Sequence, residues 1–166
     1  MKRLILIISI VLSSLSGISQ ELYTPQHLYD APQGLMDLDS LRTIKIDFYE
    51  ANYHDTLVNN WISDNGRRLP AAVHLSNGTT LDSVGVRYKG NSTFDIPNGS
   101  NNPKLPFNID INDYLAGQTL LDYKKLKLAN AMFDPTFSKE ITAYDVYRRY
   151  LPAPQANFMK VEVQGN

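Results

Sequence analysis

A group of polar residues at the end of one predicted strand could bind a phosphate group. Arg87 and Lys89 alternate with apolar residues, so both side chains point to the same face of the strand. The turn that follows, Gly90-Asn91-Ser92, offers backbone N–H groups and a hydroxyl. Arginine supplies a planar fork of donors and lysine a compact positive charge. This combination suits phosphoryl chemistry, in which positioning and charge neutralisation dominate.

Two residues further along the chain could complete such a site. Lys104 opens a later predicted strand, and Glu140 lies near the start of the second predicted helix. In protein kinases a strand lysine pairs with a helix glutamate, so Glu140 could orient a lysine here. The residues also allow a simpler interpretation, in which the cations form a solvated sheet face and Glu140 favours the positive end of its helix. No Walker-type phosphate loop is present.

Several other chemistries lack the residues that they need. The chain has no cysteine, which excludes disulfides, thiolate metal sites and a cysteine nucleophile. Its three histidines, His27, His54 and His74, lie far apart without ligand spacing, so we predict no metal site. The formal net charge of −1 gives no reason to expect a nucleic-acid partner.

The elements that must position these residues follow from hydrophobic periodicity. Alternating apolar residues predict strands at 43–48, 71–76, 79–88, 104–111, 123–128 and 157–163. Apolar residues three and four apart predict helices at 50–62 and 138–149. The order lacks a repeating β-α-β rhythm, and Asn77-Gly78 between two strands predicts a tight hairpin. We therefore predict an α+β domain, with a mostly antiparallel sheet and two main helices.

Local signals set finer expectations. Residues 95–103 are rich in turn-forming types and predict a loop. Asp134-Pro135 predicts the start of the second helix, and Asp145 and Arg149 are spaced to pair along it. One side of that helix is predicted to be a buried stripe of Phe137, Ile141, Tyr144, Tyr147 and Leu151.

The first residues, 1–19, are typical of a secretory signal peptide. Lys2-Arg3 is followed by a short apolar run, and small residues predict cleavage after Ser19. An uncleaved membrane anchor is the alternative. No later apolar run is long enough to cross a membrane, so we expect no membrane association beyond the signal peptide. We expect an extracytoplasmic protein with a lead-in segment at 20–42 and one domain at 43–166.

Several segments in order resemble the N-terminal part of the spore coat protein H (CotH) kinase family, a group of secreted atypical protein kinases. They are Arg87-Tyr88-Lys89-Gly90-Asn91-Ser92, the strand with Lys104, Lys125-Leu126-Lys127-Leu128, Phe133-Asp134-Pro135, Ala143-Tyr144-Asp145 and Pro152-Ala153-Pro154. The resemblance implies a fold like the N-terminal lobe of a protein kinase. It also implies phosphorylation of a protein substrate with ATP and Mg²⁺. Its implied nucleotide-phosphate residues are Arg87, Lys89, Gly90, Asn91, Ser92 and Lys104.

The same resemblance implies that this chain is a fragment. The last predicted strand runs into a turn signal, so we expect its hairpin partner beyond Asn166. The family's magnesium-binding and catalytic aspartates belong to a C-terminal half, so we expect this chain to be inactive on its own. Two other functions stay open. One is a non-catalytic binding or structural domain of a secreted cell-surface protein. The other is a sugar-binding or hydrolytic module that uses Trp61 and the tyrosines as a stacking platform.

Overall fold

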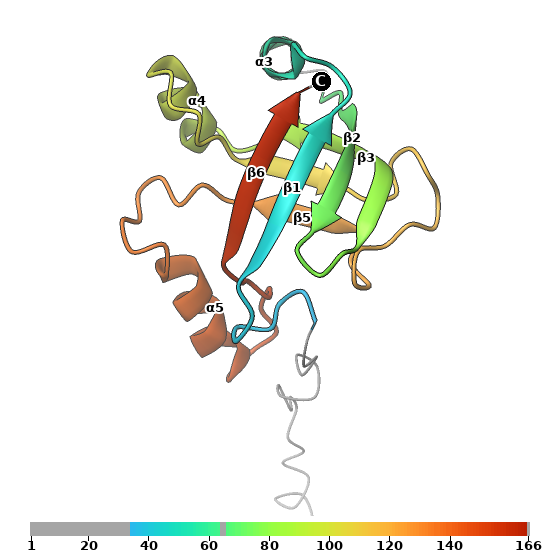
Figure 1. Cartoon of the computed structure of the whole chain (residues 1–166). Coiled ribbons are helices and arrows are strands. Elements are labelled where there is room, and N and C mark those ends of the chain that lie inside the picture. Colours follow the sequence, from blue (N-terminus) through green and yellow to red (C-terminus); the bar gives the residue numbers. More distant parts are fainter. Residues whose placement is uncertain (1–33, 64–65, 166) are drawn as a thin grey trace, which may run out of the picture.

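A computed structural model describes residues 34–63 and 66–165, which form an α+β domain (Figure 1). Its six strands make one sheet in the order β5-β4-β3-β2-β1-β6. All neighbours are antiparallel except β1 and β6, which run parallel. The bounds are β1 Arg42–Phe48, α3 Tyr53–Ile62, β2 Leu69–Leu75, β3 Thr80–Tyr88, α4 Ser92–Gly99, β4 Phe107–Asp110, β5 Lys125–Leu128, α5 Lys139–Arg148 and β6 Met159–Gly165. The predicted fold class and the mostly antiparallel sheet are confirmed.

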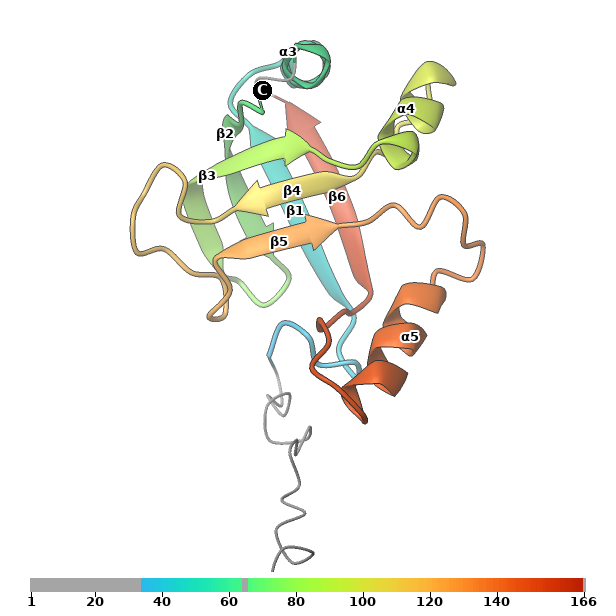
Figure 2. The ribbon, with the colours of Figure 1, turned by 180° about the vertical axis from the view of Figure 1, so that it is seen from behind.

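The sheet curls so that its two halves enclose the core. Figure 1 shows β6, β1 and β2 on one side, with β3, β4 and β5 crossing behind them, and Figure 2 shows the same crossing from the other side. The β2–β3 register shifts between Ala71 and Val73, beside Ser83 with φ +55°. Such a bulge bends the strand and increases its twist. Alternate residues then face the enclosed core, and Ile44, Ile46 and Phe48 of β1 are fully buried.

The predicted hairpin between β2 and β3 is confirmed. The Leu75 N–H donates to the Thr79 carbonyl at 2.8 Å, and the Gly78 N–H donates to the Leu75 carbonyl at 3.0 Å. Gly78 has φ +89°, a conformation that glycine adopts without steric cost. The hairpin fixes which residues of β3 face inward. Val84, Val86 and Tyr88 are buried, and Arg87 therefore lies on the opposite face.

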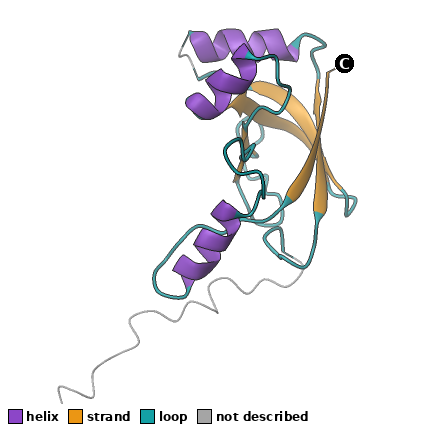
Figure 3. Ribbon diagram, turned by 90° about the vertical axis from the view of Figure 1, so that its left-hand side faces the viewer, coloured by secondary structure: helices purple, strands orange, loops and turns teal. Residues whose placement is uncertain are grey.

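The helix α3 covers one open end of the curled sheet, next to α4 (Figure 3). Leu57 is 1% exposed, and Tyr53 and Trp61 pack against the same core. The Tyr53 ring stacks on Phe48 with centroids 4.4 Å apart, and Trp61 lies 4.8 Å from Phe94. The predicted apolar face of this helix is confirmed.

The helix α4 corrects the prediction of a loop at 95–103. Phe94 and Pro97, three residues apart, are both buried, and this burial outweighs the turn preference of the sequence. Pro97 lacks the N–H that would bond to the carbonyl four residues earlier, that of Thr93. The side chain of Asn130 donates to that carbonyl instead, at 2.8 Å, and to the Lys104 carbonyl at 2.9 Å. A distant side chain therefore makes this proline tolerable inside a helix.

The predicted helix at 138–149 is confirmed as α5, but Asp134-Pro135 does not form its start. The helix begins at Lys139, and Asp134-Pro135 lies in the turn before it. The Asp134 carboxylate nevertheless caps the helix from outside, because it accepts the Lys139 N–H at 2.7 Å. The predicted pairing of Asp145 with Arg149 is confirmed at 3.1 Å.

The predicted buried stripe on α5 is wrong. None of the helix residues is buried, and Phe137, Tyr147 and Leu151 are 50%, 52% and 48% exposed. Figures 1 and 3 show the reason: α5 lies beside the sheet and does not cover it. The inward face of the sheet is already filled by side chains from its own two halves.

The last strand, β6, is an edge of the sheet and pairs only with β1 among the described residues. The Asn157 side chain, just before it, donates to the Asp37 carbonyl at 2.6 Å. This bond holds the segment at 34–41, whose Leu35 is 1% exposed and belongs to the core. The predicted signal peptide at 1–19 and the partner strand expected beyond Asn166 lie outside the described residues. None of the described helices has the length and apolar character to cross a membrane.

Candidate functional site

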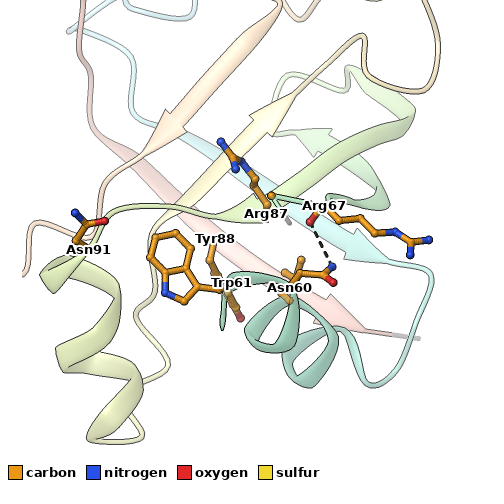
Figure 4. Close-up of a pocket in the computed structure, with 8 residues that line it drawn as sticks. Asn60, Trp61, Arg67, Arg87, Tyr88 and Asn91 are labelled. Carbon is orange, nitrogen blue, oxygen red and sulfur yellow. Dashed lines mark hydrogen bonds between the residues drawn. The ribbon is translucent and has the colours of Figure 1, made fainter. Parts of the chain in front are cut away.

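A pocket of about 150 Å³ lies where β3, α3 and the start of α4 meet (Figure 4). Its lining residues are Leu57, Asn60, Trp61, Gly66, Arg67, Arg87, Tyr88 and Asn91. Two residues predicted from the sequence, Arg87 and Asn91, are therefore brought together at one pocket. Arg87 lies near the end of β3, and Asn91 is the residue that precedes α4.

The apolar residues of the pocket lining carry no charge. Leu57 and Trp61 come from α3, and Tyr88 comes from the inward face of β3. The Tyr88 hydroxyl lies 2.8 Å from His54 Nδ1, and burial strongly raises the pKa of Tyr88. Tyr88 therefore stays a neutral phenol at physiological pH and adds no negative charge to the pocket.

The described polar residues of the pocket lining include two arginines. None of its described lining residues is acidic, whereas Arg67 and Arg87 both contribute to it. Figure 4 shows Arg67 and Asn91 on opposite sides of Trp61 and Tyr88, with the Arg67 guanidinium directed away from them. Asn60 is fixed by a bond from its amide nitrogen to the Arg67 carbonyl, at 3.3 Å.

Arg87 differs from its neighbour Arg68 in its partners. Arg68 lies 3.7 Å from both Asp110 and Asp113. Arg87 forms no ion pair within the described ranges, and its Nε, like that of Arg68, is buried without a hydrogen-bond partner. A buried donor without an acceptor costs about 1–3 kcal/mol.

The turn between β3 and α4 has a defined conformation. Gly90 has φ +84°, and a Cβ there would lie 2.1 Å from Thr93 Oγ1. Asn91 occupies the N-cap position of α4, but its side chain makes no cap bond. The N–H groups of Phe94 and Asp95 both donate to the Asn91 carbonyl at 2.8 Å. Ser92 begins the helix, so this turn forms the positive end of α4.

The predicted residues Lys89, Lys104 and Glu140 do not line the pocket. The Lys89 N–H donates to the Pro106 carbonyl at 3.1 Å. The Lys104 ammonium lies 3.9 Å from the centre of the Phe137 ring, outside the pocket lining. Glu140 is exposed in the first turn of α5, and the described residues contain no ion pair between it and Lys104.

Sequence reasoning did not assign the α3 side of the pocket to the phosphate site. Trp61 was predicted only as an apolar helix residue or a stacking platform, and Asn60, Gly66 and Arg67 were not singled out for chemistry. These residues reach Arg87 because α3 packs on Phe94. No local sequence signal specifies that long-range contact.

Neither a metal site nor a known relative defines the pocket further. No group of three or more histidine, aspartate or glutamate residues within the described ranges could hold a metal ion. No family model, curated protein or solved structure gives a significant match to this chain. The class established by the structure is an α+β domain with a curled six-stranded sheet.

Proposed function

We propose that this domain binds the phosphate groups of a nucleotide, as the N-terminal part of a secreted atypical protein kinase of the CotH type. The observation that carries the proposal is Arg87. It lines a pocket without described carboxylates, and its buried Nε has no acceptor. A phosphate group supplies the negative charge that complements the guanidinium.

The neighbouring turn supports the same ligand. Gly90, Asn91 and Ser92 lie at the positive end of α4, where backbone N–H groups favour anions. Lys89 directly follows β3, and Lys104 lies on the segment that leads into β4. In this proposal the two lysines neutralise the outer phosphates, ATP is the ligand, and a protein outside the cytoplasm is the substrate.

Magnesium fits the described residues poorly. Mg²⁺ prefers carboxylate and phosphate oxygens in near-octahedral geometry. The described residues gather no cluster of acidic side chains at the pocket. We therefore assign no Mg²⁺ ligand to this chain and propose phosphate binding, not phosphoryl transfer, as its role. A radiolabelled phosphotransfer assay that gave robust activity from this chain alone would contradict the proposal that it binds phosphate without transferring it.

Calorimetric titration with ATP tests the proposal. We expect saturable binding that Arg87→Gln weakens about tenfold or more, because a charge-assisted hydrogen bond contributes about 1.5–3 kcal/mol. Lys127→Gln is the matched control, since Lys127 is an exposed cation on β5 that does not line the pocket. Absence of ATP binding, or equal losses in both variants, would refute the proposal.

A second candidate function is a non-catalytic binding domain of a secreted surface protein. The observation that favours it is the exposed apolar surface along α5, which includes Phe137, Val146, Tyr147 and Leu151. Contiguous exposed apolar residues often mark protein interaction sites. Failure of ATP to bind the correctly folded chain would favour this role over the kinase-type one.

A further inference from the structure

We infer that the pocket recognises the phosphate group itself, that Trp61 is one of its binding residues, and that a nucleoside stays outside. This inference rests on the role of Arg87 in the proposed function. It adds that inorganic pyrophosphate is a sufficient ligand. It also assigns Trp61, on the wall of the pocket that α3 contributes, to the binding site.

The size of the pocket sets the class of ligand. A water molecule in the liquid occupies about 30 Å³, and pockets for drug-sized molecules begin at about 300 Å³. A pocket of about 150 Å³ is therefore half that lower bound. It has room for one or two phosphate groups but not for a nucleotide with its base and ribose.

The wall from α3 strengthens binding to Arg87. The Trp61 indole is held in place by Phe94, at 4.8 Å, and Leu57 beside it is buried. These apolar groups lower the local dielectric constant, and the attraction between the guanidinium and an anion increases as a result. Asn91, whose side chain makes no cap bond, also lines the pocket, across Trp61 from Arg67 (Figure 4).

Gly66 allows the chain after α3 to close against Arg87. Its φ is +57°, and a Cβ there would lie 3.0 Å from Arg87 Nη1. A Cβ at this position would require the Arg87 guanidinium to shift by a few tenths of an ångström, and the positive φ would strain any residue that carries one. Gly66 is therefore a positioning residue for Arg87, and it does not itself bind the ligand.

The chain contains a single tryptophan, so the fluorescence of Trp61 reports directly on the pocket. We would titrate the whole chain with inorganic pyrophosphate, with ATP and with adenosine, without added metal. Pyrophosphate and ATP should both change the emission and saturate, with affinities within about tenfold of each other because both present the same group. Adenosine should cause no change.

Two variants test the assignment by calorimetry with pyrophosphate. Arg87→Gln should weaken binding about tenfold or more, and Asn91→Ala about threefold, whereas Lys127→Gln should have no effect. Asn91→Ala also serves if Arg87→Gln fails to fold, since the Asn91 side chain makes no cap bond. Unchanged affinity in Asn91→Ala and in folded Arg87→Gln would overturn the inference.

The ligand series separates this inference from the proposed function. Binding of ATP without pyrophosphate would overturn the inference and leave the nucleotide function standing. Binding of pyrophosphate without ATP would support the phosphate pocket and reject the nucleotide function. If neither ligand binds, both fail. A change in Trp61 emission with adenosine alone would also overturn the inference, because the nucleoside would then occupy the pocket.

Discussion

At the scale of single residues, Gly90 sets the geometry between Arg87 and α4. Its positive φ costs an L-residue about 1–2 kcal/mol, and a Cβ would also contact Thr93 Oγ1. Gly117 has a similar φ of +87° but open space around it. We expect Gly90→Ala to lower the free energy of unfolding by more than Gly117→Ala does. Urea denaturation measures both, and equal losses would show that the contact with Thr93 has no energetic weight.

Asp134 should make the start of α5 sensitive to acid. Hydrogen bonds from Thr136 and Lys139 lower the pKa of Asp134 below its ordinary value. Because the folded pKa is below the unfolded one, the stabilisation is complete above the unfolded pKa of about 3.9 and is lost as pH falls through the folded pKa. Protection of the Lys139 amide hydrogen against exchange, measured relative to its intrinsic rate, should therefore fall as pH drops through the folded pKa. In Asp134→Asn the protection should not change over this pH range, because asparagine does not titrate, and an unchanged acid dependence in this variant would contradict the account.

At the scale of elements, α3 and α5 should differ in their contribution to stability. Leu57→Ala on α3 removes a buried side chain and should cost about 2–5 kcal/mol. Val146→Ala on α5 changes an exposed position and should stay within about 0.5 kcal/mol. Chemical denaturation of both variants tests the contrast. A large loss in Val146→Ala would mean that α5 packs on the domain more tightly than the structure indicates.

The strands could be predicted because each has one buried face, which imposes alternation on its sequence. Ile44, Ile46 and Phe48 show this pattern, and the Asn77-Gly78 turn confirms the register of its hairpin. The helix α4 could not be predicted, because it depends on Asn130 to satisfy the carbonyl that Pro97 leaves free. The apolar residues of α5 recur with helical spacing but are not buried. Periodicity therefore predicted the helix but not the burial of its residues.

The candidate site was predictable only where it is local in sequence. Arg87 and Asn91 lie four positions apart across one turn, so their proximity follows from the chain itself. Trp61 and Gly66 join them through packing between α3 and Phe94, which involves residues over thirty positions away. Such contacts depend on the whole core and leave no short motif.

At the scale of the whole molecule, the described lining of the pocket holds two arginines and no acidic residue, on a nearly neutral chain with a net charge of −1. Long-range attraction of anions by the whole surface is therefore weak, and binding must come from the short-range contacts of Arg87 and its neighbours. Among the other cations with described partners, Arg68 and Lys125 share Asp110, and Arg68 also lies 3.7 Å from Asp113.

The most direct test of phosphate binding at Arg87 is a nuclear magnetic resonance titration of the isotope-labelled chain with pyrophosphate. We predict that the Arg87 Nε–H resonance shifts strongly, together with the backbone amides of Asn91 and Ser92, while the amides of α5 stay unchanged. Arg87 is the informative probe because its Nε is buried and has no acceptor. Saturation with no shift at Arg87, or shifts confined to exposed lysines such as Lys124 and Lys127, would contradict the account.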